Sequence, residues 1–113
     1  MTIATTAAVL KAEIAHSDFE DSELAGAYTS DLLSDVMANA KDSGALITIQ
    51  AHKNTVAVAV LAGITVIILC NNRPIPVDML QSAKDEGIAI LRTSLNQFQV
   101  SGLLYALFQE DQR

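Results

Sequence analysis

The sequence has no tryptophan, a single cysteine, two prolines and few aromatic residues, namely two tyrosines and three phenylalanines. Cys70 alone cannot form an internal disulfide, and neither it nor the two histidines show the close spacing of metal ligands. Basic residues are also scarce, with 7 Lys and Arg against 13 Asp and Glu and a net charge of -6. Nucleic-acid binding by phosphate neutralisation needs the opposite balance. We therefore expect no disulfide, no metal site and no nucleic-acid partner.

Long hydrophobic segments are missing as well. The most apolar stretch, residues 55 to 70, is shorter than the about 20 residues of a membrane-spanning helix. The first residues lack the basic start and long apolar run of a secretory signal. We therefore expect a cytoplasmic protein without membrane contact. With 113 residues, half of them hydrophobic, the chain can build one core, which predicts a single domain over residues 1–113.

Helix and strand patterns alternate along this domain. Gly63 and Gly87 each follow an amphipathic or Ala-rich stretch and precede a β-branched run, as a helix C-cap does before a strand. The pattern predicts helices over residues 5–11, 31–40, 55–62, 77–86 and 96–110. It predicts strands over residues 24–29, 45–49, 64–69 and 88–91, with a weak strand at 13–16. The fold class is therefore α/β: a layered sandwich built from β-α-β units around a mainly parallel central sheet.

Right-handed β-α-β connections bring all strand-to-helix loops to the C-terminal edge of such a sheet, where ligands generally bind. Three of these loops carry a cation, although the protein has only 7 basic residues: Lys53, Arg73 and Arg92. Free amides at the following helix starts favour anions too. We therefore predict a site for a nucleotide or phosphorylated metabolite, lined by Ser30, Asp31, His52, Lys53, Asn54, Arg73, Arg92 and Thr93. In the alternative interpretation, Ser30, Asn54 and Ser94 are only helix caps and the cations are solvated.

A catalytic interpretation is weaker. It would use His52 as a general base oriented by Asp31 or Asp35, which are spaced to share a helical face. The chain lacks GxSxG, GxxxxGK[ST] and GxGxxG, and Cys70 ends a buried type of strand, where a thiol is normally inert. We therefore predict no enzymatic activity and no cofactor.

Four segments together resemble the DRTGG-domain family of small bacterial proteins: residues 28–37 (YTSDLLSDVM), 47–59 (ITIQAHKNTVAVA), 87–91 (GIAIL) and 93–98 (TSLNQF). The resemblance implies the α/β fold of the N-terminal domain of HPr kinase/phosphorylase. The motif that names the family would fall near residues 52–55, where this chain reads HKNT. In larger proteins, members accompany phosphotransacetylase or CBS-containing pyrophosphatase modules in a regulatory or oligomerising role.

Two functions thus remain open. The first is a non-catalytic regulatory module that binds a small anionic ligand at the C-terminal edge of the sheet. The second is a homodimeric assembly module with no small ligand, which would serve a protein partner in a redox or hydrogenase-related system. Its interface would come from the Ala-rich helix at 55–62 and from the last helix, through Phe98, Tyr105 and Phe108.

Overall fold

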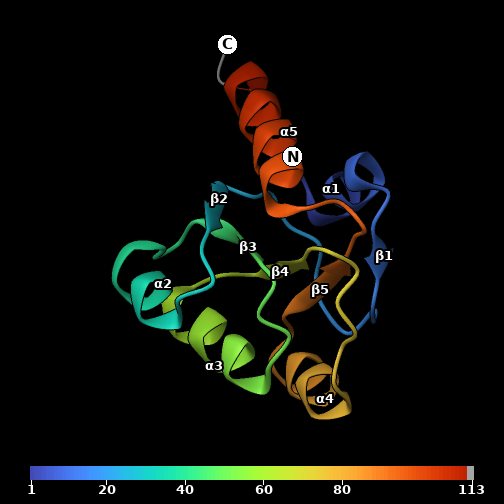
Figure 1. Ribbon diagram of the computed structural model, residues 1–113, viewed down its shortest axis with the longest axis vertical. Coiled ribbons are helices and arrows are strands. Elements are labelled where there is room, and N and C mark those ends of the chain that lie inside the picture. The colour runs from blue at the N-terminus through green and yellow to red at the C-terminus, as the bar shows by residue number, and fades with distance from the viewer. Residues whose placement is uncertain (112–113) are drawn as a thin grey trace.

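The computed structural model describes residues 1–111 as a five-stranded sheet between two layers of helices (Figure 1). The helices are α1 (Ile3–Leu10), α2 (Leu33–Asn39), α3 (Lys53–Ala62), α4 (Val77–Glu86) and α5 (Gln97–Asp111). The strands are β1 (Glu13–Ile14), β2 (Gly26–Thr29), β3 (Gly44–Thr48), β4 (Val66–Leu69) and β5 (Ala89–Arg92). The predicted fold class, α/β with a mainly parallel sheet, is confirmed.

The sheet has the strand order β1-β5-β4-β3-β2. Strands β2 to β5 are parallel, and β1 pairs antiparallel with β5, placing Glu13 opposite Arg92. Helices α2, α3 and α4 cover one face of the sheet, whereas α1 and α5 cover the other (Figure 1). Because β2 to β5 are parallel, the loop after each of these strands leaves the sheet at the same edge.

Alternate strand residues divide the core into two clusters. In β3, Ala45 and Ile47 face α1 and α5, whereas Leu46 faces α2, α3 and α4. All residues of β3 and β4 are buried, as expected for parallel strands covered on both faces. Large buried side chains fill both clusters, including Ile68, Leu91 and Leu104 on the α1 and α5 side, and Ile67, Met79 and Ile90 on the other.

Glycine ends α3 and α4 as the sequence predicts. Gly63 and Gly87 have φ values of 70° and 68°, in the left-handed region that side chains with a Cβ rarely adopt. The Gly63 N–H donates to the carbonyls of Ala59 and Val60, and the chain then turns directly into β4.

Four helix starts differ from the prediction. Helix α1 begins at Ile3 rather than at Thr5, and α5 begins at Gln97 rather than at Asn96. Helix α2 begins at Leu33 rather than at Asp31, and neither Ser30 nor Asp31 caps it, because the N-cap is Leu32 without a side-chain hydrogen bond. Helix α3 begins at Lys53 rather than at Thr55, which places Asn54 inside the helix instead of at its cap. Asp31 instead accepts the tertiary hydrogen bonds described below, and His52 occupies the N-cap position of α3 that was expected for Asn54.

Helix α5 contacts the sheet along a narrow stripe, which gives a stability test with matched neighbours. Leu104 is 1% exposed and Leu103 is 43% exposed. We expect Leu104→Ala to lower the free energy of unfolding by about 2–5 kcal/mol, because it leaves a cavity between α5 and β3. Leu103→Ala should cost less than about 1 kcal/mol. Urea unfolding of both variants measures the difference, and equal losses would contradict the orientation of α5.

Candidate functional site

The loops after β2, β3, β4 and β5 meet at the C-terminal edge of the sheet, as predicted from connection handedness. Ser30 and Asp31 follow β2, and His52, Lys53 and Asn54 stand at the start of α3. Arg73 follows β4, and Arg92 and Thr93 stand at the end of β5. The eight predicted residues therefore share one edge, but their side chains do different things there.

Asp31 is the centre of the hydrogen bonding at this edge. Its Oδ1 accepts from the Thr48 hydroxyl at 2.8 Å, from the Ile49 N–H at 2.9 Å and from Gln97 Nε2 at 3.0 Å. Its carbonyl accepts from Gln50 Nε2 at 2.9 Å. The carboxylate thus joins the end of β2, the end of β3 and the start of α5, which explains why it does not cap α2. Gln97, Thr48 and Gln50 were not among the predicted site residues.

Asp35 belongs to a separate cluster on α2. It accepts from the Tyr28 hydroxyl at 2.9 Å and from Asn39 Nδ2 at 2.9 Å. Hydrogen bonds, chiefly from Asn39 and then from Ser30 and Tyr28, hold the pKa of Asp35 below its ordinary value, and the same carboxylate raises the pKa of Tyr28. Asp31 and Asp35 therefore contact different partners, and the idea that they form a carboxylate pair on one helical face is wrong.

His52 acts as the N-cap of α3. Its Nδ1 accepts from the Asn54 N–H at 3.0 Å, in the way that a side-chain oxygen usually does at this position. The hydrogen bonds of Asp31 and Asp35 go to the residues named above and not to this ring. The contacts therefore give His52 a structural role rather than that of a base oriented by a carboxylate.

Of the remaining predicted residues, two form contacts within the protein and three have exposed side chains. Arg92 forms an ion pair with Glu13 at 3.2 Å and donates to the Asn72 carbonyl at 3.2 Å, while the Thr93 hydroxyl donates to the Leu10 carbonyl at 3.2 Å. Thr93 is only 2% exposed. In contrast, the side chains of Lys53, Asn54 and Arg73 are exposed.

The loop after β4 carries Arg73 out from the sheet. Asn71 and Asn72 have positive φ values of 60° and 52°, which asparagine tolerates better than most residues. Their N–H groups donate to the carbonyls of Leu95 and Thr93 at 2.9 and 2.8 Å, so the turn is tied to the segment that leads into α5. Arg73 directly follows this fixed turn.

Cys70 directly follows β4. Its side chain is buried, and burial, followed by the negative charge of Asp31, raises the pKa of the thiol to about 11. Burial and the raised pKa both disfavour the thiolate, which is the nucleophilic form of cysteine.

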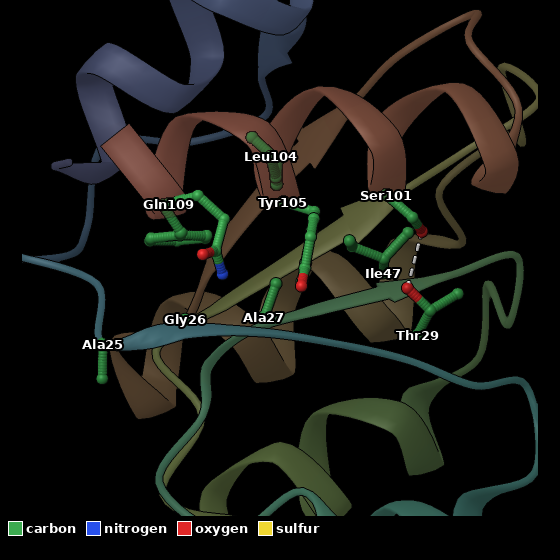
Figure 2. Close-up of a pocket in the computed structure, with 10 residues that line it drawn as sticks. Ala25, Gly26, Ala27, Thr29, Ile47, Ser101, Leu104, Tyr105 and Gln109 are labelled. Carbon is green, nitrogen blue, oxygen red and sulfur yellow. Dashed lines mark hydrogen bonds between the residues drawn. The ribbon is translucent and has the colours of Figure 1, made fainter. Parts of the chain in front are cut away.

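A groove lies beside the edge rather than in it. Helix α5 runs along β2, with Ser101 next to Thr29 and Gln109 above Gly26, and Tyr105 points from the helix toward the strand (Figure 2). The Thr29 and Ser101 hydroxyls are 2.7 Å apart. This β2–α5 groove has a volume of about 280 Å³ and is lined by Ala25, Gly26, Ala27, Thr29, Ile47, Ser101, Leu104, Tyr105, Phe108 and Gln109. From the sequence, only the α5 side of this groove could be predicted, because the last helix has an apolar side.

Two further observations concern residues 1–111. No three His, Cys, Asp or Glu side chains in this range gather in an arrangement that would hold a metal ion. No helix in the same range has the length and apolar character needed to cross a membrane.

Comparison with known proteins finds a likeness in structure only. No protein-family model and no curated protein sequence matches the chain. The fold is similar to the crystal structure of the CBS and DRTGG domains of the regulatory region of Clostridium perfringens pyrophosphatase, complexed with the activator diadenosine tetraphosphate. The TM-score is 0.72 at 13% identity, over 90% of this chain and 45% of that one. The chain thus spans less than half of that structure, and the likeness supports the DRTGG resemblance at the level of the fold.

Removal of the Asp31 carboxylate tests its role in joining the loops. Asp31→Ala leaves three donors, from Thr48, Ile49 and Gln97, without their acceptor, and we expect a loss of about 1–3 kcal/mol in the free energy of unfolding. Asp31→Asn retains an acceptor oxygen and should cost less. Urea unfolding of the two variants distinguishes them, and a wild-type value for Asp31→Ala would show that the cluster contributes nothing.

The raised pKa of Cys70 predicts its reactivity. At pH 8 only about one thiol in a thousand is ionised when the pKa is about 11, against about a quarter at the ordinary value of about 8.5. Alkylation by iodoacetamide should therefore be at least about a hundredfold slower in the folded protein than in urea, and should accelerate as the pH rises toward 11. Asp31→Asn removes the nearby charge and should increase the rate. Equal rates in folded and unfolded protein would refute this assignment.

Proposed function

We propose that residues 1–113 form a single DRTGG-like domain that acts in the cytoplasm as a non-catalytic regulatory module. In this proposal the module binds a small anionic ligand, a nucleotide or a phosphorylated metabolite, at the C-terminal edge of the sheet. The structural neighbour supports the regulatory part, because it comes from the regulatory region of an enzyme and holds a nucleotide activator. Diadenosine tetraphosphate is the ligand of that protein, and it indicates here only which chemical class of ligand to test.

The convergence of four strand-to-helix loops at one edge carries the proposal. Lys53 and Arg73 bring two exposed cations to this edge of a protein with a net charge of -6, and they form none of the ion pairs found within residues 1–111. The exposed amide of Asn54 adds a donor beside Lys53 on the first turn of α3. Cations and a helix start together favour an anion such as phosphate.

The other five predicted residues support the site indirectly. Polar groups of Ser30, Asp31, His52, Arg92 and Thr93 already have partners in the protein. We therefore assign direct ligand contact to Lys53, Asn54 and Arg73, and the positioning of the loops to these five.

The non-catalytic part rests on the states of the two candidate reactive groups. The Cys70 thiol is buried with a raised pKa, and His52 caps its own helix. Neither is arranged as one member of a nucleophile and base pair.

Thermal unfolding against ATP, ADP, diadenosine tetraphosphate and inorganic phosphate tests the proposal. A ligand at about 100 times its Kd adds roughly 2.7 kcal/mol, which raises the Tm of a domain of this size by several degrees. Lys53→Ala and Arg73→Ala should each weaken binding by about tenfold, since each removes a charged hydrogen-bond donor.

Lys41→Ala is the matched control, because Lys41 lies between α2 and β3 at the opposite edge of the sheet. It should bind as the wild type does. If none of the four compounds shifts the Tm at millimolar concentration, the ligand proposal fails, and if Lys41→Ala is as weak as Lys53→Ala, the site is elsewhere.

A further inference from the structure

We propose that the anionic ligand is a sugar phosphate, free or as part of a nucleotide, and that its hydroxylated sugar lies in a hollow between α3 and α4. This inference rests on the function proposed above, because it extends the same site from Lys53 along α4. It assigns the part of the ligand that is not anionic and the residues that recognise it.

The hollow adjoins the proposed anion site. Helices α3 and α4 lie side by side in the layer that covers one face of the sheet (Figure 1). The hollow between them has a volume of about 260 Å³ and is lined by Lys53, Asp78, Gln81, Ser82 and Asp85. Lys53 is the first residue of α3 and Asp78 is the second of α4, so both lie near the C-terminal edge of the sheet. The two sites therefore share Lys53.

Four of the five lining residues follow one line along α4. Asp78, Gln81 and Ser82, and Asp85 are three to four residues apart, which places them on one face of the helix. At a rise of about 1.5 Å per residue, Asp78 and Asp85 are about 10 Å apart along the helix axis. Their carboxylates are thus spread over two helical turns rather than gathered at one point.

Each of these carboxylates has one oxygen that can accept from a ligand. Asp78 Oδ1 accepts from the Met79 N–H at 2.8 Å, and Asp85 Oδ1 accepts from Gln81 Nε2 at 2.9 Å. The Oδ2 atoms of both residues take part in none of the hydrogen bonds or ion pairs found within residues 1–111. Both side chains are exposed, and Ser82 beside them is half-buried.

Charge selects the chemistry of the ligand. A phosphate is attracted to Lys53 and Arg73 and repelled by the carboxylates along α4, so it stays at the end with the cations. The part of the ligand in the hollow is therefore not a second anion. A single ammonium group would reach only one of two carboxylates about 10 Å apart, whereas hydroxyls on successive carbons of a sugar can donate along both turns. Carboxylates recognise ribose hydroxyls in dinucleotide-binding domains in the same way.

Isothermal titration calorimetry with four probes tests the proposal: inorganic phosphate, ribose 5-phosphate, 2-phosphoglycolate and phosphoethanolamine. We expect ribose 5-phosphate to bind at least about tenfold more tightly than phosphate, because its hydroxyls add hydrogen bonds to charged acceptors. 2-Phosphoglycolate carries a carboxylate in place of the hydroxyls and should bind no more tightly than phosphate.

Asp85→Ala and Glu86→Ala form a matched pair of variants. Glu86 is exposed on α4 next to Asp85 but does not line the hollow, and each variant removes one negative charge. Asp85→Ala should weaken the binding of ribose 5-phosphate by at least about fivefold and leave that of phosphate within about twofold. Glu86→Ala should bind both probes as the wild type does. Circular dichroism verifies that both variants fold.

The outcomes separate this inference from the function on which it rests. If phosphate binds and ribose 5-phosphate binds no more tightly, the sugar site is overturned while the anion site stands. Tighter binding of phosphoethanolamine or 2-phosphoglycolate than of ribose 5-phosphate overturns it too, as do equal losses in Asp85→Ala and Glu86→Ala. If none of the four probes binds at millimolar concentration, the proposed function fails and this inference fails with it.

Discussion

The burial of β3 and β4 on both faces determines how the rest of the chain is used. Parallel strands of this kind need a helical layer on each side. The β-α-β connections supply α2, α3 and α4, and all three lie on the same face (Figure 1). The opposite face must therefore be covered by α1 and α5, the first and last helices. Only Val100 and Leu104 of α5 are buried, so this cover is narrow and leaves the groove beside β2.

The narrow contact of α5 makes its polar attachments important. Asn96 and Gln99 exchange hydrogen bonds at the start of this helix, with the Gln99 N–H donating to Asn96 Oδ1 at 2.9 Å and the Asn96 N–H donating to Gln99 Oε1 at 3.0 Å. Gln97 then reaches Asp31, and Ser101 reaches Thr29. The edge proposed to bind a ligand and the helix that lines the groove are thus held by the same cluster.

Local signals predicted most of the fold, whereas the site depended on contacts between distant residues. Gly63 and Gly87 mark helix ends because the left-handed conformation is a property of the residue itself, and the convergence of the loops follows from connection handedness. The partners of Asp31 do not follow, because Thr48 and Gln97 come near it only once β3 and α5 are placed. The pairing of Arg92 with Glu13 likewise depends on β1 lying antiparallel to β5. Because Arg92 forms this ion pair, it is not a free cation at the predicted site.

The edge proposed to bind a ligand and the β2–α5 groove meet at one point of the structure. β2 ends at Thr29, and Ser30 and Asp31 follow directly, so the open strand edge leads into the edge with the converging loops. Any ligand that binds more tightly when β2 and α5 are in contact must, by thermodynamic reciprocity, stabilise that contact by the same factor. Thr29 and Asp31, two residues apart on this segment, both contact α5. Such coupling needs no long pathway through the core, because one short segment and one helix belong to both surfaces.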